Sequence, residues 1–93
     1  MNGNNFYLDM QEFSKKVNCF VANGRYTPKK NGKINKYALY VVNLFNSFTS
    51  PIQENIDKLV DYAKKNFKFD SVEITNGDQC CWLTFINLVV EDN

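Results

Sequence analysis

The stretch from Ser50 to Phe67 constrains the fold most, because its apolar residues recur at the spacing of a single helical face. The apolar residues on that face are Ile52, Ile56, Leu59, Val60, Ala63 and Phe67. Ser50 can cap a helix, Pro51 fits the first helical position, and Gln53 completes a capping box with Ser50. We therefore predict a helix over 51–66. Because only one side of it is apolar, it must pack against another layer.

A β-hairpin is predicted after this helix, because Asn76-Gly77 separates two apolar runs. With a two-residue loop, its strands would span 69–75 and 78–90. Side-chain alternation then puts Val72 and Ile74 on one face. On the second strand that face carries Cys81, Leu83 and Phe85, and the other face carries Cys80, Trp82, Ile86 and Leu88. The second strand outlasts the first, so we expect it to pair with another strand as well.

The N-terminal part of the chain indicates another helix, preceded by a flexible lead-in over residues 1–8. Asp9 can cap this helix, and Asn23-Gly24 is a suitable stop. The apolar residues Met10, Phe13, Val17 and Phe20 follow at spacings of 3, 4 and 3. The predicted helix therefore spans 10–22.

A second hairpin is predicted between the two helices. A strand at 25–27 would turn through Pro28 and Asn31-Gly32 into a strand beginning near Ile34. The run over 37–48 fits either a strand or a helix, and its Tyr and Val content favours a strand. The expected fold is one small α+β domain over 9–93, helix–β-hairpin–helix–β-hairpin, with a mostly antiparallel sheet packed on the helices.

Charge is strongly segregated along the chain. Residues 1–12 carry −2, residues 13–53 carry +7 and residues 54–93 carry −4, although the net charge is only +1. Such segregation predicts what a surface attracts rather than how the chain folds. It indicates a polyanionic or acidic partner.

The segment over 25–37 is the main candidate binding site. The residues expected to contact a partner are Arg25, Tyr26, Lys29, Lys30, Lys33, Lys36 and Tyr37. Lysine and arginine neutralise phosphates, and tyrosine rings can stack on unpaired bases. The same cations could instead clamp an acidic protein surface. The alternative is a solvated hairpin whose lysines only prevent edge-to-edge aggregation.

Catalysis, metal binding and cofactor binding are not predicted. The chain contains no histidine, which removes the commonest general base and a frequent metal ligand. Cys19, Cys80 and Cys81 lack the spacing of a zinc site. Glu54 and Asp61 have lysines four residues further on, which is typical of ordinary helix-surface pairs. There is no phosphate-binding glycine motif either.

Trp82 has two possible environments. Large aromatic residues of small domains are mostly core, so we expect Trp82 to pack beneath the first helix. If that helix leaves the face uncovered, an apolar patch remains for a partner or for a second copy in a homodimer.

The sequence predicts a soluble protein of the bacterial cytoplasm, because no apolar run is long enough to cross a membrane and no secretory signal is present. Its abundance of Asn, Lys, Phe, Tyr and Ile suggests an AT-rich genome, as is common for phage and mobile-element proteins. We expect a non-catalytic inhibitor or regulator of a nucleic-acid-handling host complex, such as an antidefence protein of the anti-CRISPR kind. The alternative is direct binding of single-stranded nucleic acid.

Overall fold

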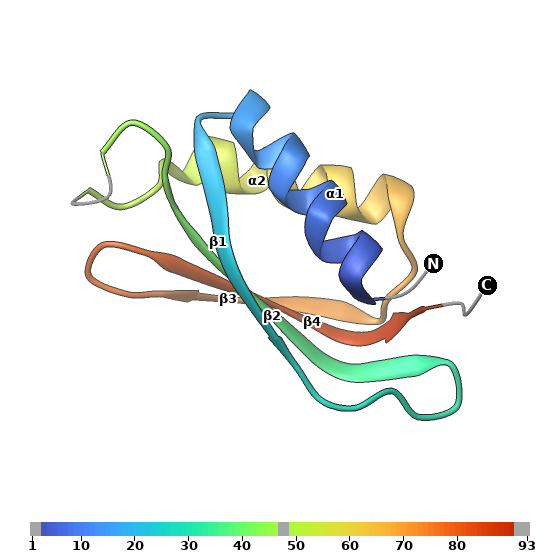
Figure 1. Cartoon of the computed structure of the whole chain (residues 1–93). Coiled ribbons are helices and arrows are strands. Elements are labelled where there is room, and N and C mark those ends of the chain that lie inside the picture. Colours follow the sequence, from blue (N-terminus) through green and yellow to red (C-terminus); the bar gives the residue numbers. More distant parts are fainter. Residues whose placement is uncertain (1–2, 47–48, 91–93) are drawn as a thin grey trace.

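The computed structural model describes residues 3–46 and 49–90, which form one antiparallel sheet and two helices. The elements are α1 (Gly3–Lys16), β1 (Cys19–Tyr26), β2 (Lys33–Asn43), α2 (Gln53–Asn66), β3 (Ser71–Asn76) and β4 (Cys81–Val89). The strand order is β1-β2-β4-β3, and both helices lie on the same side of the sheet (Figure 1). This confirms the predicted α+β fold. It also confirms a strand for the run over 37–48 as far as Asn43; residues 44–46 lie outside the strand, and residues 47–48 lie outside the described part.

The helix predicted from the strongest apolar pattern is α2, but its start differs. It begins at Gln53, and Ile52 occupies the N-cap position without a side-chain hydrogen bond. The Ser50 hydroxyl donates to the Asp78 carbonyl at 3.1 Å instead, which joins the segment before α2 to the β3–β4 loop. The predicted capping box is therefore wrong. The predicted core face is right from Ile56 onward, because Ile56, Leu59, Val60 and Ala63 are buried, but it is wrong for Ile52, which is exposed.

The N-terminal helix begins much earlier than predicted. Phe6 and Met10 are completely buried and lie four residues apart, on one face of α1. The expectation of a flexible lead-in over 1–8 is therefore wrong for residues from Gly3 onward. Asp9, expected to cap the helix, lies within α1, where its carboxylate accepts a 2.8 Å hydrogen bond from the Tyr62 hydroxyl of α2.

The same helix also ends earlier than predicted. α1 stops at Lys16, and Asn18, with φ of +59°, turns the chain into β1. Cys19 and Val21 are buried whereas Phe20 is only half-buried, which is the alternation of a strand. The 3-4-3 apolar spacing therefore extended beyond the helix into the strand that follows it.

Two polar side chains of α1 hold β1 in place. The pairing of β1 with β2 shifts between Val21 and Asn23. Next to this irregularity, the Val21 amide donates to the Ser14 hydroxyl at 3.1 Å, and the Gln11 side-chain amide donates to the Val21 carbonyl at 2.8 Å. Ser14 is completely buried, so these bonds satisfy polar groups that would otherwise be costly.

The core lies between the helices and the sheet, and Phe6 is at its centre. Its ring makes edge contacts with Tyr37 of β2, Phe85 of β4 and Phe67 after α2, with centroids 4.8–5.1 Å apart. Phe69 packs edge-on against Phe85 as well. One aromatic side chain of α1 thus joins both hairpins to the end of α2. Of the two helices in the described residues, neither has the length and apolar character needed to span a membrane.

The β3–β4 hairpin is confirmed, but its loop has four residues instead of two. Asn76 pairs with Cys81, and the Gly77 amide donates to the Cys80 carbonyl. The change shifts the register by an even number of residues. Val72 therefore pairs with Phe85 and Ile74 with Leu83, and both stay on the predicted face.

Leu88 is an exception to the predicted alternation. It is completely buried, although it was expected on the face of Trp82. Asn87 has φ of +55°, and this left-handed residue interrupts the alternation between Phe85 and Leu88. Both apolar side chains therefore reach the core.

Candidate functional site

The predicted basic segment forms the β1–β2 hairpin, and we call residues 25–36 the basic hairpin. Its outer turn is Asn31-Gly32, with φ of +55° and +76°, as a type I′ turn requires. Lys30 and Lys33 flank that turn and exchange two backbone hydrogen bonds of 2.8 and 3.0 Å. The Thr27 amide donates to the Lys36 carbonyl, which closes the base of the hairpin. The basic hairpin projects from the end of the sheet opposite the β3–β4 loop (Figure 1).

The cations of the basic hairpin are exposed, and four of the five form no ion pair with a described residue. Within residues 3–46 and 49–90, none of Arg25, Lys30, Lys33 and Lys36 forms an ion pair. By contrast, Lys15 lies 3.6 Å from Glu12 and Lys58 lies 3.7 Å from Glu54. Charges that are not neutralised locally remain available to attract an anion.

A shallow hollow of about 530 Å³ opens beside the turn. It is lined by Lys30, Asn31, Lys33, Asn35 and Asn87. Among the described residues no carboxylate lines it, and ammonium and carboxamide groups both donate hydrogen bonds to anionic oxygens. The Asn87 side-chain amide already donates to Asp70 at 2.7 Å, so the two lysines are the main anion-binding groups here.

The two predicted tyrosines have different surroundings. Tyr37 is only 2% exposed, and burial, followed by the nearby Tyr26 and Tyr7, raises its pKa to about 12. The prediction that Tyr37 contacts a partner is therefore wrong, because it is a core residue. Tyr26 is 56% exposed, but one face of its ring stacks on Tyr37 at 4.7 Å. Only its outer face can meet a partner.

The structure brings the predicted cations to one end of the molecule but not onto one face. Arg25 pairs with Ala38 and Lys36 pairs with Ile86, so both lie on the side of the sheet away from the helices. Lys30 and Lys33 lie at the tip, beside the hollow. The basic hairpin therefore presents charge around its end instead of forming a flat patch.

Trp82 does not pack beneath the first helix, contrary to expectation. Its neighbours Cys81 and Leu83 face the core, so Trp82 points to the uncovered side. There its ring lies 4.9 Å from that of Tyr40, its partner across the strands. A hydrogen bond with Cys80 raises the pKa of Tyr40. This aromatic pair was predictable only once the position of the helices was known.

The segment between β2 and α2 carries a feature that the sequence patterns missed. Leu44, Phe45 and Ile52 are exposed, and Phe45 reaches 79%. The predicted helix over 51–66 includes Ile52 on its apolar face, and the run over 37–48 that was predicted as a strand includes Leu44 and Phe45. Both predictions are wrong for these residues, because β2 ends at Asn43 and α2 begins at Gln53. Their location at the end opposite the basic hairpin separates apolar from cationic surface (Figure 1).

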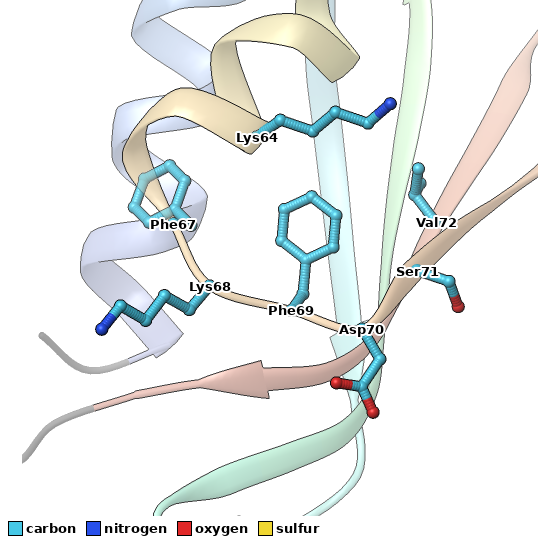
Figure 2. A pocket seen from close by; sticks show the side chains of 7 residues that line it. All are labelled: Lys64, Phe67, Lys68, Phe69, Asp70, Ser71 and Val72. Carbon is cyan, nitrogen blue, oxygen red and sulfur yellow. The ribbon is translucent and has the colours of Figure 1, made fainter.

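A second hollow, of about 520 Å³, lies between the end of α2 and the start of β3. Figure 2 shows that Lys64 extends across it toward Val72, whereas Lys68 and the Asp70 carboxylate point away. The Phe69 ring lies between the Lys64 and Asp70 side chains and packs on Phe85. The polar groups do not converge on a common point, so this hollow has no arrangement suited to chemistry.

Chemical reactivity of the thiols is limited by burial. Burial raises the pKa of Cys19 and of Cys81 to about 11, so both thiols stay protonated at neutral pH. Within the described ranges, no three His, Cys, Asp or Glu residues lie close enough to hold a metal ion. No protein-family model, curated protein or solved structure matches this chain.

Proposed function

We propose that this chain is a small non-catalytic binding protein of phage or mobile-element type. It inhibits or regulates a nucleic-acid-handling complex in the bacterial cytoplasm, as anti-CRISPR proteins do. The observation that carries the proposal is the basic hairpin, which projects from one end of the sheet and whose Arg25, Lys30, Lys33 and Lys36 form no ion pair within the described residues. Proteins that handle nucleic acid expose either nucleic acid or acidic surfaces that such a hairpin can bind by electrostatic steering.

Direct binding of single-stranded nucleic acid is the second candidate. The hollow beside the turn favours it, because Lys30 and Lys33 both line it and no carboxylate of residues 3–46 or 49–90 does. Two lysines and neighbouring amides suit a phosphate group, but a single arginine in this segment leaves little scope for reading base edges. This candidate therefore predicts binding with little sequence preference.

Affinity purification separates the two candidates. The tagged protein is captured from a nuclease-treated host lysate, and bound proteins are identified by mass spectrometry. In parallel, the purified protein is mixed with a labelled single-stranded oligonucleotide at several salt concentrations. The first candidate predicts a captured complex without an oligonucleotide shift. The second predicts a shift whose log affinity falls steeply with log salt.

A variant pair assigns the result to the basic hairpin. Lys29, Lys30 and Lys33 are changed to Glu in one protein, and Lys16, Lys58 and Lys68 are changed to Glu in the other. Both variants alter net charge equally, and all six positions are exposed. Loss of binding in the first variant alone supports the proposal. Equal binding by wild type and both variants, or the absence of any ligand, contradicts it.

A further inference from the structure

The side of the sheet that faces away from both helices, here called the open face, carries apolar side chains (Figure 1). Its two central strands contribute Ala38, Tyr40, Trp82 and Ile86, all half-buried. They alternate with buried residues such as Leu39 and Leu83, so the strands are apolar on both sides. A sheet with two apolar faces is typical of an interior layer, which implies that something covers the open face.

The strand register gives the open face a specific charge arrangement. Arg25 of β1 pairs with Ala38, Ala38 pairs with Thr84, and Thr84 pairs with Glu73 of β3. These four residues form one row straight across the sheet, with a cation at one edge and a carboxylate at the other. Both charged side chains are exposed, and neither forms an ion pair within the described residues.

We propose that a second copy of this chain packs on the open face, with the two-fold axis running along the strands. That operation places β1 of one copy over β3 of the other. Arg25 then faces Glu73 of the second copy, and the same pair repeats at the other edge. Sheets packed face to face lie about 10 Å apart, a distance that an arginine and a glutamate can bridge together. The open face is therefore complementary to itself, as a two-fold interface requires.

The opposite choice of axis is disfavoured by the same row. A two-fold axis across the strands would place Arg25 over Arg25 and Glu73 over Glu73. Like charges brought together and desolvated are repulsive. The charge pattern therefore selects the strand-parallel axis, and with it the aligned packing of a β-sandwich.

The remaining rows suit this arrangement. Tyr40 and Trp82 are cross-strand neighbours. In the dimer, Tyr40 of each copy would therefore face Trp82 of the other copy. Between the charged edges, Ala38 of one copy lies over Thr84 of the other, and these small side chains let the two sheets approach closely. Lys36 lies in the row nearest the basic hairpin, where its ammonium group can extend to water from the rim.

This dimer goes beyond the proposed function because it doubles the basic hairpin. The strand-parallel axis puts both hairpins at the same end, at diagonally opposite corners. A long polyanion or an acidic surface could then contact both at once. Two tethered contacts raise the overall affinity without any new type of interaction.

Charge reversal provides the test, with mass measured by sedimentation velocity over a range of concentrations. The wild-type protein is expected to dimerise. Arg25→Glu alone, or Glu73→Arg alone, creates two like-charge contacts and should raise the dimer dissociation constant roughly tenfold or more. The double variant R25E/E73R restores opposite charges at both edges and should recover most of the affinity. Lys65→Glu, on the outer surface of α2, should leave dimerisation unchanged.

Trp82 supplies an independent readout, because it is the only tryptophan in the chain. Its emission should shift to shorter wavelength as the concentration rises through the dimerisation range, since a second copy excludes water from the ring. A monomer at all concentrations overturns the proposal. A dimer that is indifferent to R25E and E73R overturns it too, as does a monomeric protein whose Trp82 emission responds only to an added oligonucleotide.

Discussion

The two hairpins of this sheet contain the same Asn-Gly dipeptide but differ in structure and in charge. In the first, Asn31-Gly32 forms a two-residue turn with both residues at positive φ. In the second, Asn76 is the last residue of β3 and Gly77 opens a four-residue loop. Both possible registers of the second hairpin keep the same faces, and the observed one pairs Ile74 with Leu83 and Val72 with Phe85. The same dipeptide therefore forms the turn of one hairpin but only borders the loop of the other.

The two hairpins also differ in charge. The basic hairpin carries five cations and no acid, whereas residues 71–89 carry Glu73 and Asp78 and no cation. The two hairpins point to opposite ends (Figure 1). A near-neutral protein thus has a strongly polarised surface, and only the first hairpin suits an anionic partner.

The largest expected effect concerns the core residues that anchor each hairpin. Tyr37 and Phe85 are cross-strand partners, and both contact Phe6. Changing either one to Ala should lower the free energy of unfolding by about 3–5 kcal/mol. Tyr26→Ala should cost about 1 kcal/mol or less, because Tyr26 is mostly exposed. Urea unfolding measures all three, and equal losses for Tyr26 and Tyr37 would restore the view that both are surface residues.

The next effect separates the two turns. Gly32 has φ of +76°, so Gly32→Ala should destabilise the protein by about 1–2 kcal/mol. Gly77 does not have a positive φ, and an added Cβ would meet mainly the Cys80 sulfur, which can rotate aside. Gly77→Ala should therefore cost less than Gly32→Ala in thermal unfolding. The reverse order would mean that the second hairpin, not the first, has the strained turn.

These contrasts show what the sequence could and could not predict. The apolar pattern predicted the buried face of α2 from Ile56 to Ala63 and the alternation of β4 from Cys81 to Phe85, because each buries one side of a regular element. The start of α1 was not predictable from Asp9, since Phe6 becomes a core residue only when both hairpins surround it. Ser50 matched a capping motif, yet its hydroxyl bonds to a loop distant in sequence.

Only part of the candidate site could be predicted, for the same reason. The cations of the basic hairpin were evident from the charge pattern alone. The burial of Tyr37 was not, because it depends on which face of β2 the helices cover. The pairing of Arg25 and Glu73 in one row required the register of all four strands. Short segments therefore show which charged residues lie together in the sequence, whereas only the assembled sheet shows which face each side chain occupies.

Cys80 in the β3–β4 loop and Cys81, the first residue of β4, differ in burial. Burial raises the pKa of Cys81 to about 11 from an ordinary 9.0, whereas Cys80 is partly exposed. The folded state retains a proton that the unfolded state loses, so this stabilisation is complete below pH 9 and is lost as the pH rises toward 11. Unfolding measured between pH 8 and 11 should show that decline, and Cys81→Ala should reduce it. At pH 8 a thiol reagent should label Cys80 first, and faster labelling of Cys81 would contradict its burial.

The smallest effect on stability is expected in the basic hairpin itself. Lys30 is exposed and forms no ion pair in the described part of the chain. Lys30→Glu should change the free energy of unfolding by about 0.5 kcal/mol or less. A loss of several kcal/mol in urea unfolding would show that this lysine serves the fold instead of a partner.

Retention on immobilised heparin tests the central claim most directly, because heparin is a defined polyanion and the protein has a net charge of only +1. The wild type should be retained and should elute with salt. The variant with Lys29, Lys30 and Lys33 changed to Glu should pass through. The matched variant at Lys16, Lys58 and Lys68 should elute close to the wild type, despite an equal change in net charge. Coelution of the two variants would contradict the claim that the first hairpin concentrates the binding charge.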